Sequence, residues 1–243
     1  MKTTPMRTNE SAAGSTPRPP RPTPAPLALV LAASAALPVF AADTAPTDTI
    51  YINSVSDLLA FADKCGFDQW SKGKTVILQE DLSLEDTEWA PVASFSGAFK
   101  GNGHTISDVS LVGAYSPAGF FGILEEGGSI QDLTIKGVVN PAGTQKTAGG
   151  LVGTNYGTII NCTFSGAVHG EEEAGGLVGR NETSGTIDHS TSRAMVSGAY
   201  STGGIVGYNL GVITGCTNVG AVNSAYQESA LDMEGLPATL LEP

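Results

Sequence analysis

Short apolar runs separated by glycine and asparagine recur along the second half of the chain. Three nearly identical pentads open successive units at Gly149–Gly153, Gly175–Gly179 and Gly203–Gly207, with spacings of 26 and 28 residues. An asparagine follows each pentad two positions later, and a Gly-Thr-Ile or Gly-Val-Ile stretch comes next. Self-similarity at such a period is typical of stacked repeat architectures. The pattern therefore predicts a solenoid with a unit of about 27 residues.

Each unit contains three short strand-like runs, as in Gly150–Val152, Thr158–Thr163 and Gly166–Val168. A unit of this length cannot bury its own apolar face, so it must stack on its neighbours. We therefore expect an all-β fold, a parallel β-helix of about five to six coils. Equivalent side chains should then lie about 4.8 Å apart along its axis. The glycines are expected at left-handed or tight corners, where a Cβ would clash.

Stacking places equivalent residues in columns. One inward column of small or apolar side chains consists of Leu133, Cys162, Ser190 and Cys216. Cys162 and Cys216 would be separated by two coils, about 9.6 Å, which exceeds the roughly 7 Å limit between bridged Cα atoms, so we predict no disulfide. A second column, the asparagine ladder, consists of Asn155, Asn181 and Asn209. Its amides are expected to hydrogen-bond from coil to coil.

Other patterns precede the repeats. Between Ser54 and Cys65 the apolar residues fall on one helical face, which predicts a helix of about ten residues with Ser56 or Asp57 as its N-cap. That face comprises Leu58, Leu59, Phe61 and Ala62. Lys74–Leu78 predicts a strand, and Phe95–Ile106 contains an Asn-Gly turn between apolar alternations.

The first 42 residues have the features of an export signal. Pro26–Phe40 is apolar, arginines precede it, and a small-residue cleavage site follows at Val39–Asp43. The apolar stretch is shorter than the roughly 20 residues of a membrane span, which favours a cleaved signal over an anchor. The predicted organisation is a signal peptide with a polar leader at 1–42, a linker at 43–53, an N-terminal cap at 54–74, the β-helix at 75–223 and a C-terminal tail or cap at 224–243.

The charge and the cysteine spacing limit which partners and which kinds of site are expected. The 243-residue chain has a net charge of −12, and cleavage after Ala42 would leave 8 basic and 23 acidic residues. Nucleic acid and anionic lipid require clustered Lys and Arg, so neither is expected as a partner. The three cysteines, Cys65, Cys162 and Cys216, lack the spacing of a disulfide framework or of a zinc site.

The Gly-Leu-hydrophobic-Gly cores at Gly150–Gly153, Gly176–Gly179 and Gly204–Gly207 resemble the GLUG-motif repeat family. The resemblance covers roughly Leu58 to Val222. It implies a right-handed parallel β-helix of pectate-lyase-like architecture with the short helix as an N-terminal cap. It also implies export and surface display in bacteria, with an adhesin-like role in some members. Some zinc peptidases that cleave immunoglobulin A contain the motif too, but the His-Glu-x-x-His sequence of their catalytic domain is absent here.

Catalytic side chains do not recur from coil to coil. A polysaccharide lyase of this fold needs clustered carboxylates for calcium and a basic side chain, whereas a hydrolase needs paired carboxylates. The nearest candidates are Lys100, His104, Asp108, Asp188 and Arg193. Because they do not build a groove, no catalytic residue is assigned, and a carbohydrate-active enzyme remains the alternative function.

Two sets of residues are candidates for binding. Glu171, Glu172 and Glu173 lie in a loop between coils and Glu125-Glu126 occupy a related loop; they would hold Ca²⁺ if the loops project together, while a solvated loop is the alternative. Three tyrosines on the repeats could present a platform for sugar rings: Tyr156, Tyr200 and Tyr208. Packing at the coil edge would explain these tyrosines equally well.

We therefore expect a secreted or cell-surface module without catalytic activity, which binds a glycan or a host surface protein. A structural spacer, or a fragment of a larger surface protein, is the second alternative. No membrane span is expected after signal cleavage, no cofactor is assigned, and the oligomeric state stays open.

Overall fold

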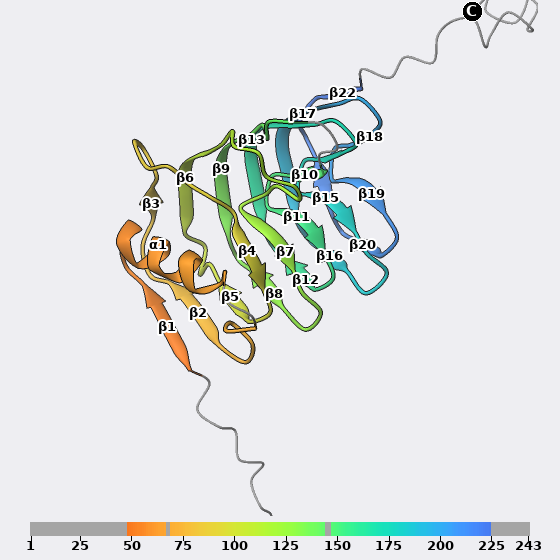
Figure 1. The fold of residues 1–243 in the computed structure, drawn as a ribbon. Helices are drawn as coiled ribbons and strands as arrows, with labels where there is room; N and C mark the ends of the chain where they lie inside the picture. The colour runs from red at the N-terminus through yellow and green to blue at the C-terminus, as the bar shows by residue number, and fades with distance from the viewer. Residues whose placement is uncertain (1–47, 67–68, 144–146, 225–243) are drawn as a thin grey trace, which may run out of the picture. The chain divides into compact units, whose positions relative to one another are not determined.

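The computed structural model describes residues 48–66, 69–143 and 147–224, all of which lie within one compact unit, Thr44–Pro243. Within these ranges the chain forms a single helix, α1 (Val55–Lys64), and strands that pair in parallel. Figure 1 shows the strands stacked side by side along one axis, from orange β1 to blue β19. The predicted parallel β-helix with a short N-terminal helix is therefore confirmed. The predicted signal at 1–42 lies outside the described residues, as does the tail after Ser224.

Four parallel sheets run along the described part of the solenoid. Sheet A consists of β1 (Thr49–Ile52), β2 (Thr75–Leu78), β5 (Ala98–Lys100), β8 (Ser129–Gln131), β12 (Thr158–Ile160), β16 (Thr186–Asp188) and β20 (Val212–Thr214). Sheet B consists of β3 (Leu82–Ser83), β6 (Thr105–Leu111), β9 (Thr134–Val139), β13 (Thr163–Gly170), β17 (Thr191–Gly198), β21 (Thr217–Asn218) and β22 (Val222–Ser224). Sheet C consists of β4 (Val92–Phe95), β7 (Phe121–Leu124), β11 (Val152–Asn155), β15 (Val178–Asn181) and β19 (Val206–Asn209). Sheet D consists of β10 (Thr147–Gly149), β14 (Glu173–Gly175) and β18 (Ser201–Gly203).

One complete repeat supplies four strands, β10 to β13, rather than the three runs that the sequence predicts. We call such a set of strands a rung. The first glycine of each pentad ends the sheet D strand, and the next two residues separate it from the sheet C strand, which the apolar pattern alone does not reveal. The register follows the sequence period, because Ile159 opposes Ile187 and Asn155 opposes Asn181. Successive rungs therefore place equivalent residues directly above one another.

The core changes in character along the axis. Aromatic rings fill the first rungs, namely Phe61, Trp89, Phe95, Phe99, Phe120 and Phe121, all buried. One inward column of sheet B then runs from Ile135 through Phe164 and Ser192 to Asn218. Large apolar side chains thus give way to smaller polar ones toward the C-terminal rungs. The N-terminal rungs bury the greater apolar area and gain the greater hydrophobic stabilisation.

Helix α1 covers the N-terminal end of this core. Leu58 and Phe61 are buried, and the Phe61 ring lies 5.7 Å from the Phe95 ring and 5.8 Å from the Phe99 ring. Leu59, which was expected on the same face, is 39% exposed. The helix therefore closes the first rung with a narrower apolar stripe than predicted.

The N-cap of the helix lies two or three residues before the predicted positions. Ser54 is the N-cap, because its Oγ accepts a hydrogen bond from Asp57 N at 3.1 Å. Asp57 Oδ2 in turn accepts from Asn53 N at 3.0 Å, so the two side chains form a capping-box-like pair. The prediction of Ser56 or Asp57 as N-cap was wrong, since Asp57 is the reciprocal partner.

The linker predicted at 43–53 is also wrong at its C-terminal end. Thr49–Ile52 forms β1, the first strand of sheet A, and pairs in register with Thr75–Leu78. The N-terminal cap is thus a strand followed by a helix. Four alternating residues between polar segments were too short a signal to separate a strand from a linker.

The corner between sheets A and B uses left-handed residues that are mostly not glycine. Asn102, Asp132, Asn161 and His189 have φ values of 53, 53, 50 and 43°. Asn and Asp tolerate this conformation better than most residues do. The Asn-Gly turn at Asn102 is therefore a corner between two sheets, whereas the glycines of the three pentads have no left-handed φ. Of the two expected reasons for the pentad glycines, the left-handed conformation does not apply, whereas the clash of a Cβ at a tight position does.

Close packing of sheet D against sheet C explains the last glycine of each pentad. A Cβ on Gly179 would lie 2.9 Å from Ala148 N, and one on Gly207 would lie 2.6 Å from Ala174 N. Both neighbours belong to the sheet D strand of the preceding rung. Only a residue without a side chain allows the two backbones to approach so closely.

The last described rung is open. Ile213 is 38% exposed although its equivalent Ile187 is buried, and Val222 is 40% exposed although Val196 is buried. The described solenoid therefore has one end closed by α1 and one end with exposed apolar side chains.

Candidate ligand-binding site

The asparagine ladder stiffens the corner that follows sheet C. Asn155 Nδ2 donates to Asn181 Oδ1 at 2.7 Å, and Asn181 Nδ2 donates to Asn209 Oδ1 at 2.8 Å. Asn155 and Asn181 are fully buried. Asn155 Oδ1 also accepts from Gly157 N, so the ladder holds the backbone that turns toward sheet A. Residues beside the ladder are thereby held in fixed positions.

Arg180 lies beside the ladder and joins sheet C to sheet D. Its Nε donates to Glu182 Oε1 at 2.6 Å, and its Nη1 donates to Glu173 Oε1 at 2.7 Å. Glu173 Oε2 accepts a further hydrogen bond from Thr147 Oγ1. The hydrogen bonds to these two carboxylates raise the pKa of the Arg180 guanidinium above its ordinary value, and the bond to Glu182 has the larger effect. The guanidinium is thus held between two carboxylates in its charged form.

Two of the three candidate tyrosines lie near Arg180. Tyr208 opposes Arg180 in the next rung, and the Arg180 guanidinium carbon lies 4.7 Å from the centroid of its ring. Tyr156 directly follows Asn155, one rung on the other side of Arg180. Tyr156 and Tyr208 are 37% and 40% exposed. We call Tyr156, Arg180, Glu182 and Tyr208 the tyrosine surface.

Tyr200 is not part of this surface. It lies between β17 and β18, and its backbone N–H donates to Glu171 O at 3.1 Å. The three tyrosines therefore do not form the single strip that a sugar platform along one column would require. Sequence reasoning missed Arg180 and Glu182, although Arg180 precedes the ladder asparagine by one position and Glu182 follows it by one.

The acidic run at Glu171–Glu173 does not converge on a metal site. Glu173 is the first residue of β14 and is paired with Arg180. Among the described residues, no group of three or more His, Cys, Asp and Glu side chains is placed to hold a metal ion. Glu173 therefore belongs to a protein ion pair, and Ca²⁺ binding by this run stays a prediction.

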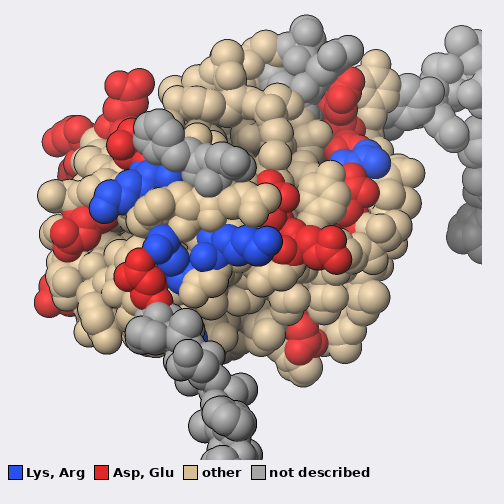
Figure 2. Space-filling model, turned by 60° about the horizontal axis from the view of Figure 1, so that its bottom comes forward, with Lys and Arg blue, Asp and Glu red and all other residues tan. Residues whose placement is uncertain are grey.

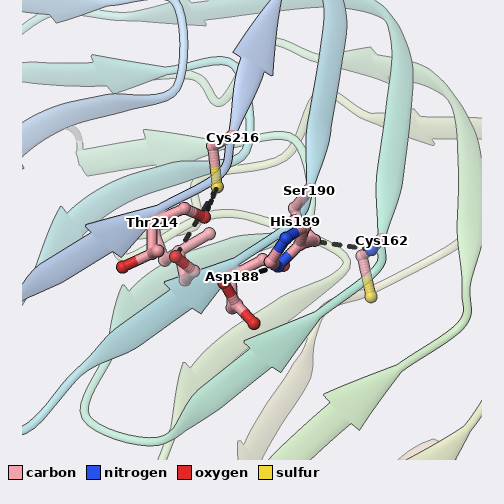
Figure 3. A network of polar contacts seen from close by, with 7 residues as sticks. Cys162, Asp188, His189, Ser190, Thr214 and Cys216 are labelled. Atoms are coloured by element: carbon pink, nitrogen blue, oxygen red, sulfur yellow. Dashed lines mark hydrogen bonds and ion pairs between the residues drawn. The ribbon is translucent and has the colours of Figure 1, made fainter.

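Neither Cys162 nor Cys216, both in the inward column, forms a nucleophile–base pair with the nearby His189. Cys162 N donates to Ser190 Oγ at 3.1 Å, and Cys216 Sγ donates to Thr214 O at 3.4 Å (Figure 3). Cys162 Sγ donates to Ile160 O at 3.2 Å. His189 Nδ1 instead lies 2.7 Å from Asp188 Oδ1. All three cysteines of the chain are unbridged, with Ser190 between Cys162 and Cys216.

Burial also makes these thiols poor nucleophiles. Desolvation raises the pKa of the Cys162 thiol to about 12, and it raises the pKa of the Cys216 thiol as well. The reactive species is the thiolate, which is scarce at neutral pH under these conditions. Cys162 therefore acts as a small apolar side chain of the core, and Cys216 packs against that core.

The other sequence candidates for catalysis are engaged in local contacts. Hydrogen bonds from Thr105 N and from His104 lower the pKa of Asp81, with His104 Nδ1 3.1 Å from Asp81 Oδ1. Hydroxyls of Ser83 and Ser107 lower the pKa of Asp108. Lys100 opposes Gln131 and Arg193 opposes Ser165, so neither is paired in register with a carboxylate. These groups do not converge on one groove.

The surface carries charges of both signs. Figure 2 shows Lys and Arg side chains next to Asp and Glu side chains on one face, with uncharged surface between them. Within the described residues, no helix has the length and apolarity needed to cross a membrane.

Comparisons with known proteins agree with this architecture. The family model described as "The GLUG motif" matches residues 144–168. Halomucin from Haloquadratum walsbyi (strain DSM 16790 / HBSQ001) is 36% identical over 144 residues, which is 53% of this chain and 2% of halomucin. The chain thus corresponds to a small part of that relative.

A solved structure shows the same fold. It is a candidate immunoglobulin A1 protease from Bacteroides ovatus, with a TM-score of 0.59 and 22% sequence identity. The match covers 72% of this chain and 57% of the solved chain, and at this identity it speaks for the fold alone. Together with the pentads and their register, the matches confirm the predicted resemblance: the chain is a parallel β-solenoid that contains the GLUG motif.

Proposed function

We propose that this chain is a non-catalytic extracellular module that binds a glycan on the tyrosine surface. The observation that carries the proposal is the placement of exposed Tyr156 and Tyr208 on either side of the Arg180–Glu182 pair. The two tyrosines are two rungs apart, or about 9.6 Å along the axis. This distance suits an extended chain of sugar rings that contacts one tyrosine after the other.

Each part of the surface has a role in such binding. Aromatic rings provide an apolar face for the C–H groups of a sugar, and their hydroxyls provide polar edges. Arg180 and Glu182 offer a donor and an acceptor for sugar hydroxyls between the two rings. The buried ladder and the ion pairs fix these groups before the ligand arrives, which lowers the entropic cost of binding.

Export to the cell surface belongs to the same proposal. The signal-like N-terminus and the similarity to halomucin support it. An enzyme of the polysaccharide lyase or hydrolase class would need converging carboxylates and a base, and the described candidates lie in separate local contacts.

The test is a glycan-array and polysaccharide-binding screen of the purified chain, with and without calcium, in which released sugars are measured in parallel. We expect saturable binding without product release. Tyr156→Ala and Tyr208→Ala should each weaken binding about tenfold, which corresponds to one lost stacking contact of about 1.4 kcal/mol. Tyr51→Ala is the matched control, because Tyr51 is an exposed tyrosine on β1.

Release of unsaturated or reducing sugars would replace this proposal with the enzyme alternative. Absence of binding to every glycan would leave a structural spacer as the better account.

A further inference from the structure

A polar cavity of about 470 Å³ is lined on one side by Cys65, Gly66, Gln69, Ser71 and Lys72 and on the other by the outer side of β4 with Glu125 and Glu126. Its polar lining comprises Gln69, Lys72, Ser94, Ser96, Glu125 and Glu126. The volume is within the range of small-molecule binding sites. None of these residues belongs to the tyrosine surface, so the cavity is a separate feature.

The walls of the cavity are held by hydrogen bonds beneath it. Ser71, which is 3% exposed, accepts from Ser96 N through its Oγ at 2.9 Å, and the two hydroxyl oxygens lie 3.3 Å apart. Ser94 Oγ donates to Glu125 Oε1 at 2.7 Å. The Glu125 carboxylate is thus oriented by sheet C before any ligand enters.

The charged side chains of the cavity do not form ion pairs with one another. Within the described residues, the side chains of Lys72 and Glu126 make no hydrogen bond and no ion pair, although both line the same space. Glu125 uses one oxygen for Ser94. Two carboxylates therefore face one ammonium group, and the imbalance favours a ligand that brings a positive charge.

We propose that this cavity binds a small hydroxylated compound with a primary ammonium group, such as an amino sugar. Glu125 and Glu126 receive the ammonium, since charge-assisted hydrogen bonds are stronger than neutral ones. Lys72, Gln69 and Ser96 hydrogen-bond the neighbouring hydroxyls.

The first arm of the test compares two ligands that differ in the ammonium group. Isothermal titration of the full chain with glucosamine and with N-acetylglucosamine, at about pH 6, keeps the glucosamine amine protonated. We expect glucosamine to bind at least about tenfold more tightly. Equal affinity for the two sugars, or binding of neither, would overturn the proposal. Ethanolamine, which retains the ammonium and one hydroxyl, should bind more weakly than glucosamine; equal binding would remove the requirement for a sugar ring.

The second arm locates the site. Glu125→Gln and Glu126→Gln keep the shape of the side chains and should each weaken glucosamine binding about tenfold. Glu80→Gln, an exposed glutamate that does not line the cavity, should have no effect. Unchanged affinity in both cavity variants, with unchanged thermal unfolding, would place the ligand elsewhere and refute the assignment. Tyr208→Ala should leave glucosamine binding unchanged, which separates this site from the proposed glycan surface.

Discussion

The Arg180 guanidinium lies over the Tyr208 ring, with its carbon 4.7 Å from the ring centroid, while the same guanidinium is hydrogen-bonded to Glu173 in the adjacent sheet. One side chain therefore links an exposed ring to the packing of sheet D on sheet C. The orientation of the tyrosine surface depends on this arginine as much as on the tyrosines themselves.

Replacing Arg180 with Lys should expose this dependence. Lys keeps a positive charge but cannot donate to two carboxylates in a fixed plane or stack on the ring in the same way. We expect the free energy of unfolding to fall by about 1 kcal/mol, as for a partly exposed pair with good geometry. Urea denaturation measures this. Arg193→Lys, on the outer face of sheet B, is the control, and equal losses in both variants would contradict the special role of Arg180.

The ladder predicts unequal costs for its members. Asn181→Ala should lower the unfolding free energy by about 2–3 kcal/mol, because it removes two ladder bonds and leaves the buried Asn155 amide without its acceptor. Asn209→Ala affects an exposed member and should cost less than about 1 kcal/mol. Urea titration of both variants checks the order. A larger loss for Asn209 would show that the ladder is not cooperative across rungs.

The repeat period was sufficient to predict the stacking of Asn155, Asn181 and Asn209, because strict recurrence fixes the register of a parallel solenoid. It was insufficient for Arg180, whose partner Glu173 is on another sheet; their contact depends on how sheet D packs. The left-handed corner at Asn161 was missed for another reason. Asn, Asp, His and Gly alternate there from rung to rung, so the column has a shared conformation without a shared residue.

The pentad glycines should tolerate no side chain. A Cβ on Gly175 would lie 1.8 Å from Val178 O, so Gly175→Ala requires movement of the backbone between sheets D and C. We expect a loss of unfolding free energy of about 3 kcal/mol or more, as for strongly overpacked sites. Gly127→Asn is the control, because that glycine has open space around it and a left-handed φ that Asn accepts. Similar stability of the two variants would refute the close-packing explanation.

The thiols should differ in reactivity. Cys162 is buried with a pKa raised to about 12, whereas Cys216 lies in the open last rung and is partly exposed. We expect a disulfide reagent at about pH 8 to modify Cys216 first and Cys162 only when the protein unfolds. Cys216→Ser should remove the fast phase. Rapid labelling of Cys162 in that variant would show that the rung opens in the native state.

Acid should destabilise the N-terminal end of sheet B. The pKa values of Asp81 and Asp108 are lower in the folded state than their ordinary value of 3.8. Their contribution to stability is therefore complete well above pH 3.8 and is lost as the pH falls through the lower folded values. In Asp81→Asn/Asp108→Asn the urea midpoint should vary less with pH below about 4. Asp63→Asn, on α1, is the control, and an unchanged pH profile in the double variant would exclude this linkage.

Because α1 covers the first rung while the last described rung is open, the two ends of the described solenoid should differ in stability. The rungs beneath α1 contain most of the largest buried side chains, so we expect folding to start there and later rungs to form on them. Where Ser192 and Asn218 replace Phe164, less apolar burial holds the rungs together. Fraying should therefore start at β20–β22 and travel toward the N-terminus, with the asparagine ladder and the Arg180–Tyr208 contact as the first barrier that it meets.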